Sequence, residues 1–80
     1  MEKDIFRTWI YDGKNKETRY GINDTYHFAS RIENDEDFCE RVTRDFMHDL
    51  NLPDDDFGHW NSLIWDWASD YTELCGAGCS

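Results

Sequence analysis

The chain has 80 residues, of which 39 % are hydrophobic and 16 % aromatic, and its formal net charge is −10 at pH 7. These values predict one small folded domain and exclude a disordered acidic tail, because the aromatic side chains can bury large apolar areas. No apolar run approaches the roughly 20 residues of a membrane-spanning helix. The first residues lack the basic and apolar segments of a signal peptide, so we expect a cytoplasmic protein of a bacterial host cell.

The first part of the chain favours β-structure. Residues 5–11 are rich in aromatic and β-branched side chains, and Asp12-Gly13-Lys14-Asn15 follows as a turn signal. Residues 16–22 are expected to return as a second strand. A third strand is indicated by alternating side chains at Tyr26, Phe28, Ser30 and Ile32. Residues 1–32 are therefore predicted to form a β-hairpin or a three-stranded antiparallel meander.

After position 32 the hydrophobic period changes from two residues to 3.6. Asn34 is expected to cap a first helix that ends near Asn51 and has its apolar positions at Phe38, Val42, Phe46 and Leu50. A second helix follows residues 53–58, with an apolar stripe at Trp60, Leu63, Ile64, Trp67, Tyr71 and Leu74. The sequence thus predicts a single α+β domain in which two amphipathic helices pack on one face of a small antiparallel sheet.

The charge is concentrated in one part of the chain. Residues 1–32 hold six Lys or Arg and five Asp or Glu, a net of +1, whereas residues 33–80 hold two and thirteen, a net of −11. A field of one sign accelerates encounter with an oppositely charged partner and repels nucleic acid. We therefore expect residues 33–80 to face a basic surface and residues 1–32 to act as scaffold. The alternative is that the charge only keeps a small protein soluble.

Two acidic features are candidate partner-binding sites. Trp65 lies outside the centre of the apolar stripe, beside the carboxylates of Asp66, Asp70 and Glu73, and such a composition is typical of an interface hot spot. The connection between the two helices carries the other feature, Asp54-Asp55-Asp56 followed by Phe57. The competing interpretations are that Trp65 packs against the first helix or the edge of the sheet, and that the connection is solvated with Asp56 capping the second helix.

The cysteines and histidines give no strong indication of a metal site. Cys39 is expected to be a small core residue. Cys75 and Cys79 have no matching second pair, so a zinc site would need His48 or His59 from another element, and we keep this only as an alternative. The sequence has no nucleophile and base in a recognisable order and no phosphate-binding loop. We therefore predict a non-enzymatic protein that needs no cofactor.

Three short segments carry a resemblance to a known family: Leu50-Asn-Leu-Pro53, Phe57-Gly58 and Ile64-Trp65-Asp66. Across about residues 32–70 the sequence resembles the barstar-type inhibitors of secreted bacterial ribonucleases. The resemblance implies an acidic face that plugs a basic active site, with Asp66 at the family's most critical inhibitory aspartate and with Asp56 and Phe57 at loop aromatics. The sequence departs from the family at Asp56, which replaces an aromatic, and at Ser62, where the family has a second aspartate. The strands and the helix that follow in the family have no counterpart in these 80 residues.

These features lead to a hypothesis and an alternative. The leading hypothesis is an acidic inhibitor, in effect a DNA mimic, that blocks a basic nucleic-acid-binding or active-site surface of a larger protein. Its setting is either the immunity partner of a toxin nuclease, as the resemblance implies, or a phage anti-defence protein such as an anti-CRISPR or anti-restriction factor, by analogy of size and charge. The alternative is a structural or adaptor module, including a homodimer, that offers its aromatic stripe to another helix. No direct contact with nucleic acid or membrane is expected.

Overall fold

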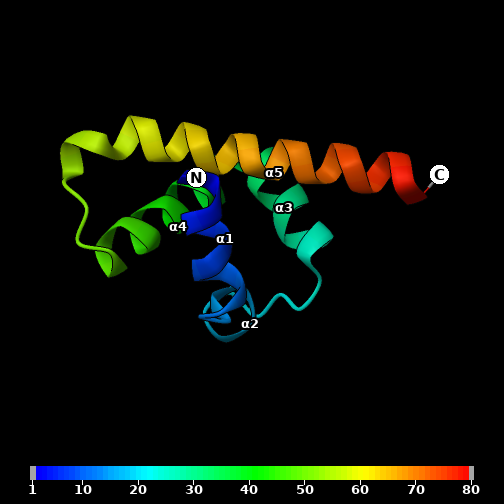
Figure 1. The fold of residues 1–80 in the computed structure, drawn as a ribbon, viewed down its shortest axis with the longest axis horizontal. Helices are drawn as coiled ribbons and strands as arrows, with labels where there is room; N and C mark the ends of the chain where they lie inside the picture. The colour runs from blue at the N-terminus through cyan, green and yellow to red at the C-terminus, as the bar shows by residue number, and fades with distance from the viewer. Residues whose placement is uncertain (1, 80) are drawn as a thin grey trace.

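The chain folds around one long C-terminal helix. A computed structural model describes the backbone of residues 2–79 and the side chains of residues 2–74, and this part of the chain contains helices and no strand. The elements are α1 (Glu2–Tyr11), α2 (Asn15–Thr18), α3 (Thr25–Asn34), α4 (Glu36–Asp49), a 3₁₀ turn η1 (Asp54–Asp56) and α5 (Phe57–Cys79). In Figure 1, α5 runs along the longest dimension, and α1, α3 and α4 all lie on the same side of it.

The predicted α+β class is therefore wrong, beginning with the expected first strand over residues 5–11. The buried residues of this segment are Phe6, Trp9 and Ile10, which a helix places on one face because they are three and four residues apart. A strand would have put Trp9 on the face opposite Phe6 and Ile10. Ile5, whose β-branched side chain suggested a strand, is 45 % exposed. The break at Asp12-Gly13 exists, but it leads into the short helix α2, so the second strand and the hairpin are absent from the described residues.

The third expected strand is α3. Its buried side chains are Phe28, Ala29 and Ile32, which again follow a helical period, while Tyr26 stays exposed. Asp24 is the N-cap of this helix: its carboxylate oxygen Oδ2 accepts a hydrogen bond from the main-chain N–H of His27 at 3.0 Å. The alternation of apolar residues at even positions was a coincidence with this helical pattern.

The two predicted helices are confirmed as α4 and α5, with a shift at the first boundary. Asn34 ends α3, and Asp35 is the residue that caps α4, accepting a hydrogen bond from the main-chain N–H of Phe38 at 3.2 Å. The end of α4 lies where the sequence placed it. Asn51 takes the left-handed conformation (φ 55°), and the N–H of Leu52 reaches back to the carbonyl oxygen of Met47 at 2.9 Å.

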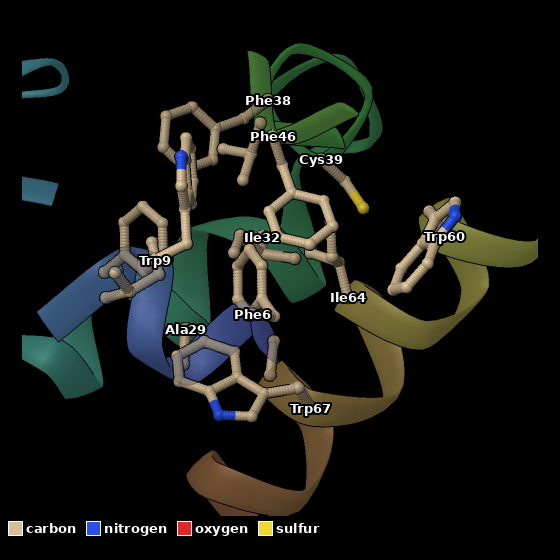
Figure 2. Packing of buried hydrophobic residues seen from close by; sticks show 14 of the residues in the cluster. Phe6, Trp9, Ala29, Ile32, Phe38, Cys39, Phe46, Trp60, Ile64 and Trp67 are labelled. Atoms are coloured by element: carbon tan, nitrogen blue, oxygen red, sulfur yellow. The ribbon is translucent and has the colours of Figure 1, made fainter. Parts of the chain in front are cut away.

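Aromatic rings from α1, α3, α4 and α5 meet in the core. Figure 2 shows Phe6 of α1 between Phe46 of α4 and Trp67 of α5, and its ring centroid lies 5.5 Å from that of Phe46 and 5.1 Å from that of Trp67. Both contacts are edge-to-face, the arrangement that the ring quadrupoles favour. Phe28 of α3 joins the same cluster through Phe38 and Trp67. The core therefore uses aromatic side chains from along the whole chain to hold α1, α3 and α4 against α5.

Two polar side chains of α2 are buried and had not been expected in the interior. Asn15 Nδ2 donates a hydrogen bond to the main-chain oxygen of Trp9. Lys16, only 6 % exposed, donates from Nζ to the main-chain oxygen of Asn23 at 2.7 Å and forms an ion pair with Glu17. Because a buried ammonium group needs such partners, these contacts fix α2 and the connection to α3 in place.

Candidate functional site

One flank of α5, which carries most of the predicted site, is tied to the first turn of α1. Lys3 Nζ and Asp70 Oδ2 lie 2.8 Å apart, and His59 Nε2 lies 2.9 Å from Glu2 Oε2. The hydrogen bond from Lys3 to Asp70 raises the pKa of the lysine, and the charges of Asp70 and Asp66 raise it further. Asp70, predicted as a binding residue, therefore already has a cationic partner inside the chain.

The opposite flank of α5 is tied to the end of α3. The indole N–H of Trp65 donates to the main-chain oxygen of Glu33 at 3.3 Å, and the hydroxyl of Thr72 donates to the Glu33 carboxylate at 2.9 Å. Trp65 is 41 % exposed and lies beside α4, the first predicted helix, so it is a partly buried residue rather than a core residue. Its hydrogen bond fixes the edge of the ring while much of the ring surface faces solvent.

Between these flanks, the outer surface of α5 exposes Asp66 and Glu73, which form no ion pair or hydrogen bond with the described residues. Other carboxylates of the C-terminal part share this property. We call the whole set the unpaired acids: Glu36, Asp37, Glu40, Asp54, Asp55, Asp56, Asp66 and Glu73. All of them fall on α4, η1 and α5. Within residues 1–32, by contrast, the described carboxylates other than Asp12 have a bonding partner.

The predicted loop site, Asp54 to Phe57, lies on a different part of the surface from Trp65. Asp54–Asp56 form η1, whose side chains are exposed, and Asp56 shows no capping hydrogen bond to α5 within the described residues. Phe57 is half-buried against the core, and the guanidinium carbon of Arg44 lies 5.6 Å from its ring centroid. Asp54 and Phe57 line an open groove with residues from the end of α4, including His48. The structure does not bring this loop and Trp65 into one groove.

Trp65 instead shares a groove with the beginning of α4. We call this the Trp65 groove: it has a volume of about 450 Å³ and is lined by Glu36, Cys39, Glu40, Asn61, Ser62 and Trp65. Glu36 and Glu40 are four residues apart and thus lie on the same side of successive turns of α4. The groove therefore has two unpaired carboxylates on one wall and an exposed indole on the other.

The uncharged residues Cys39 and Asn61 of the Trp65 groove are held by hydrogen bonds to their neighbours. Cys39 is buried, as expected, and its thiol lies 3.4 Å from Asn61 Oδ1, which also accepts a hydrogen bond from the buried hydroxyl of Thr43 at 3.0 Å. Burial raises the pKa of the Cys39 thiol, and the negative charges of Glu40 and Glu36 raise it further. A raised pKa disfavours the thiolate, so the groove gains no negative charge from Cys39 at neutral pH.

Sequence reasoning identified Trp65 but missed the two glutamates beside it. Neither Glu36 nor Glu40 was among the predicted site residues, because the close approach of α4 and α5 is a tertiary contact. The i, i+4 spacing of the two glutamates was the only available signal. It shows that they share a side of the helix, but not that this side faces Trp65.

Neither a metal site nor a membrane-spanning segment appears in the described part of the chain. Among residues 2–74 no three side chains of His, Cys, Asp or Glu converge as metal ligands would, and the side chains of Cys75 and Cys79 lie outside the described residues. No described helix has both the length and the apolar composition that crossing a bilayer requires.

Comparisons with protein families, curated proteins and solved structures give no match to this chain. The resemblance to barstar-type inhibitors therefore stays a prediction, and the assignment of a function depends on the geometry and charge of the site.

Proposed function

We propose that the protein is an acidic inhibitor that binds a basic nucleic-acid-binding or active-site surface of a larger protein. The observation that carries this proposal is the set of unpaired acids on α4, η1 and α5, with the exposed ring of Trp65 among them. Carboxylates that have no partner in their own fold remain free to meet the cations of another protein.

The chain's own cations do not neutralise these acids. Lys3, Arg7, Lys16 and Arg19 form ion pairs with carboxylates outside the unpaired set: Asp70, Asp4, Glu17 and Asp49. Arg31, Arg41 and Arg44 lie over aromatic rings of the fold. If the charge served solubility alone, the excess acids would not need to concentrate on three consecutive elements and leave the rest of the surface close to balanced.

The exposed ring of Trp65 would lengthen the lifetime of a complex, which charge alone does little to extend. Long-range attraction raises the rate of encounter, whereas a fully desolvated aromatic anchor contributes most to the lifetime of a complex. Trp65 is already held by Glu33, so little side-chain freedom is lost on binding. Both settings suggested by the sequence, immunity against a toxin nuclease and phage anti-defence, need such an inhibitor.

The test is capture from bacterial lysate followed by measurement on the purified partner. The wild-type protein is the bait at low salt, and the captured protein is purified and titrated at about 50 and 500 mM NaCl. Asp66→Asn with Glu73→Gln should weaken binding about tenfold at low salt, because two rim charges are lost. Asp12→Asn is the matched control, since Asp12 is exposed and unpaired but lies outside the C-terminal part.

The captured protein should also bind nucleic acid more weakly when the inhibitor is bound. We expect the wild-type chain to displace labelled DNA or RNA from the partner, and the double variant to do so about tenfold less effectively. Binding that is independent of salt, or equal losses with Asp12→Asn, would contradict the proposal.

A second candidate, the adaptor or homodimer module, is favoured by one observation. Most of the aromatic stripe of α5 is used by the protein's own core, but Leu74 is 74 % exposed and lines a groove between α1 and α5 with Tyr11 and Tyr71. Sedimentation of the wild-type chain against Leu74→Ser tests this candidate. A dimer that this substitution dissolves would favour it, and a monomer at high concentration would remove it.

A further inference from the structure

We propose that the Trp65 groove binds an arginine side chain of the partner protein. The inference rests on the proposed function and deepens it by naming the chemical group that the groove recognises. It depends on three features of the groove: two carboxylates on one wall, an unoccupied aromatic ring on the other, and a floor that does not supply a competing cation.

The carboxylate wall matches a guanidinium group. Glu36 and Glu40 stand on successive turns of α4, so two acceptor groups face the same space, and Ser62 adds a hydroxyl from α5. A guanidinium presents five N–H donors in a rigid plane and can bond two acceptors at once, whereas a lysine ammonium is a single point charge. No Lys or Arg of the described chain lines the groove, so its negative charge is not compensated from within.

The ring wall follows a pattern already present in the fold. Four arginines lie over aromatic rings, at 4.4–5.8 Å from the guanidinium carbon to the ring centroid: Arg19 over Trp9, Arg31 over Phe38, Arg41 over Tyr20 and Arg44 over Phe57. Trp65 has no such cation among residues 2–74, although an indole is the ring that attracts cations most strongly. The groove thus has the acceptor and the ring of an arginine site, but not the arginine.

Hydrogen bonds already hold the side chains of Trp65 and Asn61 in place. The indole edge is held by the main-chain oxygen of Glu33, and Asn61 is held by Thr43 and Cys39. An arginine that enters would meet groups that are already placed, so the entropy cost falls mainly on the incoming side chain. A metal ion is a poorer occupant, because among the described residues no third side chain of His, Cys, Asp or Glu converges with the two glutamates as a metal ligand would.

The experiment uses blocked tetra-arginine and tetra-lysine peptides as probes of equal charge. Each is titrated into the labelled full chain at about 50 mM NaCl, and NMR follows the indole N–H of Trp65 and the amides of Glu36, Glu40 and Ser62. We expect these signals to shift saturably with tetra-arginine. Its affinity should exceed that of tetra-lysine by about fivefold, the effect of one cation–π contact at an exposed site.

Variants then separate the two walls. Trp65→Ala should abolish the preference for arginine, Trp65→Phe should keep part of it, and Glu36→Gln with Glu40→Gln should weaken both peptides at least fivefold. Asp12→Asn should leave the titration unchanged. Because Trp65, Glu36 and Glu40 are exposed, these variants should fold, and circular dichroism verifies that they do.

The outcomes distinguish this inference from the proposed function. Equal affinity for the two peptides, or shifts centred on Asp54–Asp56 or Asp66, would overturn the arginine site and leave an acidic binding surface intact. Titrations in which neither peptide shifts any signal of α4, η1 or α5 in a salt-dependent way would overturn both.

Discussion

The side-chain amide of Asn15 donates a 2.7 Å hydrogen bond from Nδ2 to the main-chain oxygen of Trp9. The last carbonyls of a helix have no partner within the helix, so a buried side chain of α2 satisfies one of them for α1. Gly13 lies directly against both atoms. A Cβ atom at this position would stand 2.5 Å from Asn15 Nδ2 and 2.6 Å from the Trp9 oxygen.

Gly13→Ala should therefore destabilise the protein by about 1–3 kcal/mol, because the added methyl group must displace the backbone or break the hydrogen bond. Gly58→Ala is the control: its Cβ would meet nothing within 4 Å, and the φ of Gly58 is not positive. That substitution should stabilise the chain by about 0.5 kcal/mol. Urea denaturation measures both, and equal effects would contradict the close contact at Gly13.

The sequence could predict α4 and α5 because their apolar periods are long and unbroken. Phe38, Val42 and Phe46 are all buried in α4, and Trp60, Ile64 and Trp67 in α5, as a helical period over many residues requires. The exposure of Trp65 also followed from its place on the helical wheel. The helices that the sequence predicted correctly depend on the pattern of neighbouring residues within one segment.

The helices α1 and α3 could not be read from the same kind of pattern because their periodic segments are short. Residues 5–11 suit a strand by composition, and only the contacts of Phe6 with Phe46 and Trp67, far along the chain, decide for a helix. In α3 the capping residue Asp24 was available as a signal of a helix start, but the alternating side chains that follow it favoured a strand. The Trp65 groove could not be predicted from the sequence either, because Glu40 and Trp65 are brought together only by the packing of α4 on α5.

Asp49 should make the stability depend on pH. A hydrogen bond from the Trp9 indole, donated at 2.9 Å, and the nearby charge of Arg19 at 2.9 Å lower the pKa of this carboxyl in the folded state. The unfolded chain then binds a proton more readily than the folded chain. The stabilisation is fully present above the ordinary pKa of about 4 and is lost as the pH falls through the lower folded value.

Asp49→Asn should cost about 0.5–1 kcal/mol at pH 7, because Asn keeps an acceptor oxygen but loses the charge that attracts Arg19, in a pair that solvent partly screens. At about pH 2.5 the difference from the wild-type chain should shrink, since the carboxylate there is becoming protonated. Urea denaturation at the two pH values measures this. Asp12→Asn should show no such change, and a constant difference for Asp49→Asn would contradict the assigned ion pair and hydrogen bond.

Phe6 should be among the most costly residues to truncate. It is fully buried between rings of α4 and α5, so Phe6→Ala removes the transfer energy of the ring and leaves a cavity, at about 3–5 kcal/mol. Ile5→Ala, on the exposed side of the same helix, should cost less than about 1 kcal/mol. Thermal and urea denaturation compare the two; a similar loss for both would contradict the orientation of α1.

The unpaired acids should make the protein more stable in salt. Their mutual repulsion opposes folding, and added ions screen it, so the melting temperature should rise by about 2–5 °C between 20 and 500 mM NaCl. Asp66→Asn with Glu73→Gln should reduce this rise, whereas Asp12→Asn should leave it nearly unchanged. A melting temperature that falls with salt would mean that surface ion pairs such as Lys3–Asp70 outweigh the repulsion.

The separation between the aromatic core and the unpaired acids has a consequence for how such a protein can evolve. Substitutions at Glu36, Asp54, Asp66 or Glu73 remove no ion pair or side-chain hydrogen bond of the described residues. These positions can therefore follow a changing partner rapidly, while Phe6, Phe28 and Trp67 are restrained by packing. Diverging copies of this chain should vary most at the unpaired acids and least in the rings beneath them, so that changes of the surface and the requirements of folding fall on different residues.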